Sequence, residues 1–264
     1  MHLQPIDPSL SLIAIQAALQ AGKLLRNAFG SKFDIATKTN SQDLVTQFDK
    51  AAESTIIDLI KSHFPKHTFL GEESGHSDEN IGPVHWIIDP LDGTMNFAHE
   101  IPLFTVSIAA LVDNQVIIGI VYDPMRNELF AAQKGVGAFL NGTPISVSNR
   151  QDMLTSVGAT LFPYGEGDLR HRAIEQFVKF LHVGNPIRII GSAAMALAYV
   201  AAGRFDAFWG VKLKPWDIAA GKLLIEEAGG MLTNYDGTPH NLTNYDGIVA
   251  SNSLLHQEIL SCLK

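Results

Sequence analysis

Apolar and polar residues alternate with the period of a helix in the first part of the chain. Asp7 and Ser9 each offer an N-cap, and Pro8 suits the first turn of a helix that continues until Gly30. One face of this helix is apolar, so we expect it to pack on a sheet. That face carries Leu10, Ile13, Ala17, Leu24 and Leu25.

Strand patterns dominate the next part of the chain. A short strand is predicted over 33–39, a turn over 40–43, and a second helix from about 45 to 63, which Pro65 ends. Apolar β-rich runs then predict strands, two of which are joined through Asp113-Asn114 as an antiparallel hairpin. These runs cover residues 68–70, 84–88, 104–112, 116–122 and 128–133.

The second half alternates short strands with helices, which is typical of layered α/β proteins. We expect residues 1–150 to form an N-terminal α+β lobe and residues 151–264 a C-terminal α/β lobe. The strands are predicted at 156–161, 188–190, 205–209 and 247–250, and the helices at 170–182, 193–202, 215–228 and 253–263.

Composition limits the classes of function. The chain has 264 residues, 46% hydrophobic content and a formal net charge of −8, so it can bury a large core and lacks the basic surface typical of nucleic-acid binding. Its single cysteine, Cys262, fits a reducing compartment. Without a secretory signal or an apolar run of membrane-spanning length, the protein is expected to be cytoplasmic, with no membrane partner.

The segment from Trp86 to Thr94 carries the strongest chemical signal. An apolar strand leads into Asp89, Pro90 fixes the backbone, and Asp92 follows three positions later. Two buried carboxylates are costly unless a cation compensates them, and all-oxygen ligation favours Mg²⁺, Mn²⁺ or Ca²⁺. We therefore predict a metal site here.

Three other acids stand at the ends of predicted elements. Glu72 follows a short strand, while Asp49 and Asp217 lie near the starts of helices. Taken singly, a solvated loop acid or a helix cap explains each of them at least as well. Together with Asp89 and Asp92, Glu72 and Asp217 suggest one shared ligand site, because ligands gather at such positions in layered α/β folds.

Several motifs resemble those of the inositol monophosphatase family. They are Asp89-Pro90-Leu91-Asp92-Gly93-Thr94-Met95-Asn96-Phe97, Gly71-Glu72-Glu73-Ser74, Trp216-Asp217-Ile218-Ala219-Ala220-Gly221 with Gly229-Gly230, Lys38, Asp43 to Thr46, Asp49, and Gly191 to Ala194. The resemblance spans nearly the whole chain. It implies a five-layer α/β/α/β/α sandwich, a homodimer, and lithium-sensitive, Mg²⁺-dependent hydrolysis of phosphate monoesters.

The resemblance also implies roles for individual residues. Glu72, Asp89 and the Leu91 carbonyl would hold one Mg²⁺, and Asp89, Asp92 and Asp217 a second, with a weaker third beside Glu72. Thr94, supported by Asp49 and by Glu72, would orient the attacking water. Lys38 is a further candidate residue of the site. The implied substrate contacts are Asp92, Gly93, Thr94, Gly191, Ser192, Ala193 and Asp217.

Two positions depart from the family pattern. Gly210 stands where familiar inositol phosphatases carry a glutamate that contacts a substrate hydroxyl, and Ala196 stands where bacterial members often carry an acid. The expected substrate is inositol 1-phosphate, with fructose 1,6-bisphosphate, nucleotide 3′-phosphates and histidinol phosphate as alternatives. A different class of function, an interaction protein in a bacterial transcription complex without direct nucleic-acid binding, also stays open.

Overall fold

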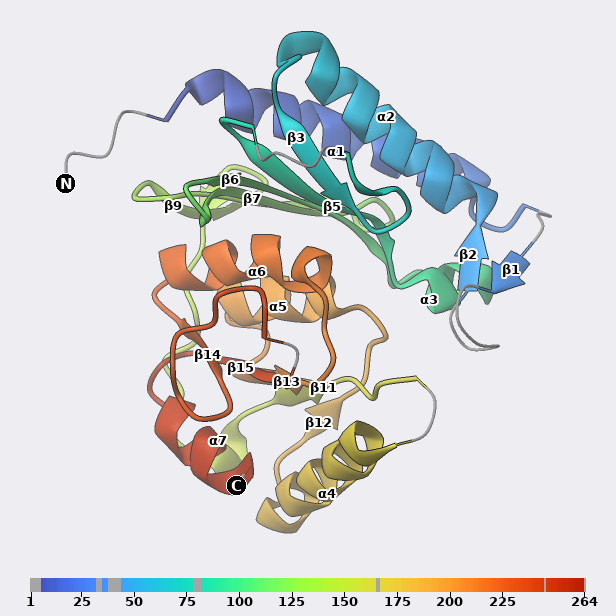
Figure 1. The fold of residues 1–264 in the computed structure, drawn as a ribbon. Helices are drawn as coiled ribbons and strands as arrows, with labels where there is room; N and C mark the ends of the chain where they lie inside the picture. The colour runs from blue at the N-terminus through green and yellow to red at the C-terminus, as the bar shows by residue number, and fades with distance from the viewer. Residues whose placement is uncertain are drawn as a thin grey trace.

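Helices and sheets alternate in five layers, as the computed structural model shows for residues 6–31, 35–37, 44–77, 82–164, 167–244 and 246–263 (Figure 1). Helices α1 (Pro8–Ala28) and α2 (Gln47–His63) cover the outer face of an eight-stranded sheet. Helices α5 (Ala193–Ala201) and α6 (Pro215–Glu227) lie between this sheet and a five-stranded one. The remaining layer consists of α4 (Asp168–Val183) and α7 (His256–Leu263). The predicted α/β/α/β/α sandwich is confirmed.

The eight-stranded sheet has the order β10-β9-β8-β7-β6-β5-β3-β4. Only β3 and β5 pair in parallel; the other neighbours are antiparallel. The predicted hairpin at Asp113-Asn114 is confirmed, since both residues have the positive φ that its tight turn requires. The strands are β3 (Thr68–Gly71), β4 (Gly75–His76), β5 (His85–Asp92), β6 (Thr105–Val112), β7 (Gln115–Asp123), β8 (Glu128–Gln133), β9 (Gly137–Leu140) and β10 (Thr143–Pro144).

The five-stranded sheet has the order β12-β11-β13-β15-β14. Its strands are β11 (Gly158–Thr160), β12 (Ile187–Arg188), β13 (Ala207–Gly210), β14 (Met231–Asn234) and β15 (Ile248–Ser251). The sequence pattern did not predict β14, because only Leu232 and Thr233 are buried and no alternation results. Pairing with β15 is what makes this segment a strand.

The start of the second helix was predicted two residues too early. Thr46 is the N-cap of α2: its hydroxyl accepts the Phe48 N–H at 3.1 Å, and the Asp49 carboxylate accepts the Thr46 N–H at 2.8 Å. The preceding residues form β2 (Leu44–Thr46), which pairs with β1 (Ile35–Thr37). The predicted turn at 40–43 and the ends of the predicted strand lie outside the described residues.

Close helix–sheet packing brings the two halves of the chain together. A Cβ atom on Gly119 in β7 would lie 2.7 Å from the carbonyl oxygen of Ala220 in α6, so only glycine permits this approach. Asp217 lies in the first turn of this helix. Within the described part of the chain, no helix has the length and apolarity needed to cross a membrane.

Candidate active site

A β-bulge aligns the two aspartates of strand β5. Asp89 pairs with Ser107 and Asp92 with Thr105, so three steps along β5 match two steps along β6. In a regular strand, residues three apart point to opposite faces. The extra residue at the bulge brings both carboxylates to one face and also accommodates Pro90, which has no N–H for the ladder. The strand was predicted to end at Asp89 and turn; it instead continues through Asp92.

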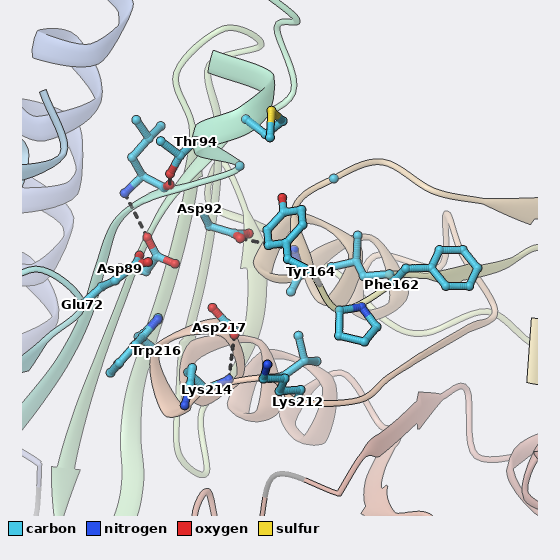
Figure 2. Close-up of a pocket in the computed structure, with 18 of the residues that line it drawn as sticks. Glu72, Asp89, Asp92, Thr94, Phe162, Tyr164, Lys212, Lys214, Trp216 and Asp217 are labelled. Atoms are coloured by element: carbon cyan, nitrogen blue, oxygen red, sulfur yellow. Dashed lines mark hydrogen bonds between the residues drawn. The ribbon is translucent and has the colours of Figure 1, made fainter. Parts of the chain in front are cut away.

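Four carboxyl groups converge at this point (Figure 2). Carboxylate oxygens of Asp89, Asp92 and Asp217 all lie within 4.8 Å of one another. Glu72 follows β3, whose parallel pairing with β5 brings the ends of both strands to the same edge, and its N–H donates to the Ile88 carbonyl at 3.1 Å. The predicted acids therefore meet from three separate elements.

Burial and mutual repulsion perturb these acids. Burial is the largest cause that raises the pKa of Asp89 well above its ordinary value, followed by the charges of Glu72, Asp92 and Asp217. Burial and then the charge of Asp92 raise the pKa of Asp217 well above its ordinary value, partly opposed by a backbone hydrogen bond from Lys214. Such a cluster is stable in its charged form only with a cation, and its hard oxygen donors suit Mg²⁺, Mn²⁺ or Ca²⁺.

Asp92 is anchored from the helix layer between the two sheets. The Ser192 hydroxyl and the Ala194 N–H, the latter at 2.7 Å, donate to its Oδ2, and the Ala193 N–H donates to Oδ1 at 3.4 Å. These hydrogen bonds oppose the effect of burial, which is the main cause that raises the pKa of Asp92. The N-terminus of α5 thus holds one aspartate in place.

The predicted substrate contacts next to α5 differ in whether they face the cavity. Gly191 and Ala193 line the cavity, whereas Ser192 is fully buried behind it and donates to Asp92. Ala196 is buried in the core between the sheets and Gly210 is buried in β13. Lys38 lies outside the described residues.

Thr94 and Asp49 form a hydrogen-bonded pair beside the acids. The Thr94 hydroxyl lies 3.1 Å from Asp49 Oδ1 and 3.0 Å from the Leu91 carbonyl, and it donates to one of these acceptors at a time. Asp49 is fully buried, and its Oδ2 accepts the Thr46 hydroxyl at 2.6 Å. The Thr94 proton is therefore donated to one of these two acceptors, which leaves a lone pair of its oxygen to accept a hydrogen bond.

Gly93 permits the turn that places Thr94. Its φ is +102°, and a Cβ atom there would lie 2.9 Å from the Leu103 carbonyl oxygen. It is the N-cap of the short helix α3 (Thr94–Ala98). A side chain at this position would displace the segment that carries Thr94, because both the backbone conformation and the space require glycine.

The sequence analysis missed Glu53, although it lies one helical turn after Asp49 on the same face of α2. Glu53 is 3% exposed, and its carboxylate accepts the N–H groups of Glu73 and Ser74, each at 2.9 Å. A Cβ atom on Gly71 would lie 2.4 Å from Glu53 Oε2, so the loop packs directly on this carboxylate. Glu53 thereby fixes the segment that carries Glu72. The spacing of four residues from Asp49 was the available signal.

The acids open into a cavity of about 480 Å³. Its wall combines the β5 segment with residues 161–164, which follow β11, residues 211–214, which connect β13 to α6, and Trp216 and Asp217 of α6. A volume of this size accommodates a small organic ligand. Thr94 lines the cavity and Asp49 lies behind it, so the site presents a hydroxyl, carboxylates and two lysines to a ligand.

Comparison with known proteins gives the same picture over the whole chain. Residues 8–264 match the inositol monophosphatase family. The chain is 42% identical to "Nus factor SuhB" of Escherichia coli K12 over 96% of its own length and 94% of the relative. It is 40% identical to "Inositol-1-monophosphatase" of Synechocystis, over 95% and 87% of the two lengths.

Solved structures agree with these relatives. The extragenic suppressor protein suhB from Bartonella henselae superposes with a TM-score of 0.91 at 36% identity, covering 97% of this chain and 98% of the other. Inositol monophosphatase from Anabaena superposes with a TM-score of 0.85 at 37% identity, covering 97% and 95%. The similarity therefore includes both sheets.

Proposed function

Because the chain belongs to the inositol monophosphatase family and is a phosphoric monoester hydrolase, we propose that it cleaves a small phosphorylated polyol, with inositol 1-phosphate as the first candidate. Enzymes of this family are metal-dependent. The convergence of Asp89, Asp92 and Asp217 at one cavity is the observation that carries the proposal.

Mg²⁺ is the cation we propose for the acidic cluster. Glu72, Asp89 and the Leu91 carbonyl would hold one ion, and Asp89, Asp92 and Asp217 the second, with a weaker third beside Glu72. When bound, the ions neutralise charge on the phosphoryl group and lower the pKa of water. The raised pKa values of Asp89 and Asp217 support this proposal, because the cluster repels itself without a cation.

Thr94 and Asp49 are proposed to position the attacking water. With its proton directed to Asp49 or the Leu91 carbonyl, the Thr94 oxygen can accept a hydrogen bond from that water. The buried hydrogen bond between Thr46 and Asp49 keeps the Asp49 carboxylate oriented for this task. Gly93, Thr94, Asp92 and Asp217 would surround the phosphate, and Gly191 and Ala193 the polyol.

Replacement of Asp92 by Asn tests the metal-dependent reaction. Phosphate release from inositol 1-phosphate should fall on the order of 10²–10³-fold in saturating Mg²⁺, because the amide removes a charged ligand while keeping the shape. Asp113→Asn is the matched control, since Asp113 is exposed at the hairpin tip and already has a positive φ that asparagine tolerates. Near-wild-type turnover by Asp92→Asn, with an unchanged far-UV spectrum, would contradict the metal assignment.

The identity of the preferred ester is a separate proposal. Inositol 1-phosphate, fructose 1,6-bisphosphate, a nucleotide 3′-phosphate and histidinol phosphate should be compared at one Mg²⁺ concentration. Clear preference for inositol 1-phosphate supports the first candidate, and a preference for another ester replaces it.

A second function is suggested by the relatives named Nus factor SuhB. We propose that this chain also binds a component of the bacterial transcription machinery, through protein contacts rather than direct nucleic-acid binding. Binding to purified RNA polymerase, measured by surface plasmon resonance, should persist in the Asp92→Asn variant. Absence of binding by both the wild type and the variant would remove this proposal and leave the phosphatase unaffected.

The family also suggests three properties of the whole protein. We propose that it is a cytoplasmic homodimer and that Li⁺ inhibits it. Light scattering of the purified chain measures the mass, and Li⁺ titration at fixed Mg²⁺ measures the inhibition. A monomeric mass, or activity unchanged by Li⁺, would contradict the corresponding proposal.

A further inference from the structure

Side chains of both charges line the cavity. Its carboxylates all belong to the acidic cluster, and its lysines come from the connection between β13 and α6 (Figure 2). The first set is Glu72, Asp89, Asp92 and Asp217, and the second is Lys212 and Lys214. Among the lining residues that the structure describes, none outside the cluster is an acid. The part of a substrate that extends beyond the reacting phosphate therefore meets cationic rather than anionic side chains.

Lys212 is held in an unfavourable backbone conformation. Its φ is +60°, a left-handed value that a residue with a Cβ atom adopts at a cost and glycine adopts freely. Its side chain is exposed, and it makes no ion pair with any residue of the described ranges. Because Lys212 also lines the cavity, its ammonium group is available to a ligand there.

Compensation of the acidic cluster is the simplest alternative use for this lysine. However, the charge of Lys214 already lowers the pKa of Asp217, and the Lys214 backbone N–H donates to the Asp217 carboxylate at 2.7 Å. Lys214 therefore already supplies a positive charge beside the acidic cluster. Lys212 can bind a ligand instead.

The nearby strand end offers no carboxylate to bind a neutral polyol. A Cβ atom on Gly210 would lie 3.2 Å from Leu213 Cδ1 and 3.3 Å from Phe208 Cζ, so apolar side chains fill that direction. A neutral polyol needs acceptors for its hydroxyl protons. Gly210 has no side chain to supply such an acceptor, and the Lys212 ammonium group can only donate hydrogen bonds.

Space for an additional group adjoins Lys212. Together with Pro163 and Tyr164, Lys212 lines both the main cavity and a smaller hollow of about 200 Å³. Arg170 and Asp168 also border this hollow.

We infer that the non-reacting part of the substrate carries a second anionic group, a phosphate or a carboxylate, which Lys212 binds. This inference rests on the proposed phosphatase function, and it places phosphate esters that carry a second anionic group ahead of inositol 1-phosphate, which carries none. An ammonium group binds such anions through charge-assisted hydrogen bonds, which are stronger than those to a neutral hydroxyl.

Two pairs of esters test the second anion. Fructose 1,6-bisphosphate is compared with fructose 1-phosphate, and 3-phosphoglycerate with glycerol 3-phosphate, so the pairs distinguish a second phosphate from a carboxylate. The wild type should favour the anionic member of at least one pair about tenfold or more in kcat/KM. Lys212→Asn, which tolerates the positive φ, should remove most of that preference, whereas Lys179→Asn on the exposed face of α4 should retain it.

The outcomes separate this inference from the proposed function. Hydrolysis of inositol 1-phosphate without preference in either pair overturns the inference and leaves the phosphatase in place. An equal fall of both members in Lys212→Asn also overturns it, because that result assigns Lys212 to the folding of its loop. Failure of the wild type on all five esters with Mg²⁺ would overturn both.

Discussion

Glu53 offers a test of how the Glu72 segment is positioned. Its buried carboxylate accepts two backbone N–H groups, at 2.9 Å each, from the residues that directly follow Glu72. Replacement by glutamine leaves one acceptor oxygen and turns an NH₂ group toward the second N–H. Since a hydrogen bond to a charged group contributes about 1.5–3 kcal/mol, the loss of one should release the loop by roughly that amount.

The expected consequence is weaker activation by Mg²⁺. If the loosened loop weakens Mg²⁺ binding at the proposed Glu72 ligand by about 1.4 kcal/mol, the Mg²⁺ concentration for half-maximal activity rises about tenfold. Phosphate release is measured across a Mg²⁺ titration for the wild type, Glu53→Gln and Asp58→Asn, the last being an exposed acid on the same helix. At saturating Mg²⁺ the Glu53→Gln rate should recover most of the wild-type value.

Two results would contradict this role of Glu53. An unchanged half-maximal Mg²⁺ concentration in a folded Glu53→Gln variant would show that the loop keeps Glu72 in place without this carboxylate. An equal change in Asp58→Asn would attribute the effect to the helix charge instead.

Two further predictions follow from the site and the core. Thr94→Val should lower kcat on the order of 10²-fold with little change in KM, and Thr94→Ser should restore most of it, because only the hydroxyl orients the water; equal kcat values for Val and Ser would contradict this. His240 is 3% exposed, and burial lowers its pKa to about 4, while its Nε2 has no hydrogen-bond partner in the described structure. Because the unfolded chain protonates this histidine near pH 6.5, the stability that it contributes is fully present above that value and is lost as the pH falls toward 4. Thermal melting from pH 4 to 8 should therefore show a shallower acid decline for His240→Leu than for the wild type, and parallel curves would contradict the assignment.

The sequence by itself determined much of the local structure and the chemistry. Helix α1 begins at the cap that Asp7 offers, and the β6–β7 hairpin turns at Asp113-Asn114, because caps and tight turns depend on residues within a few positions. The acids Glu72, Asp89, Asp92 and Asp217 were identified from motifs, and the structure brings them together. The division of the chain into lobes at residue 150 stays a prediction.

Tertiary structure alone decided how these residues meet. The bulge that aligns Asp89 with Asp92 is set by the register with β6, and the anchoring of Asp92 depends on Ser192, a hundred residues away in the sequence. Strand β14 exists because β15 pairs with it. Such features follow from pairing between distant segments, whereas periodicity and capping report only on neighbours along the chain. The sequence therefore supplied the groups that we propose for the chemistry, and the fold supplied their geometry.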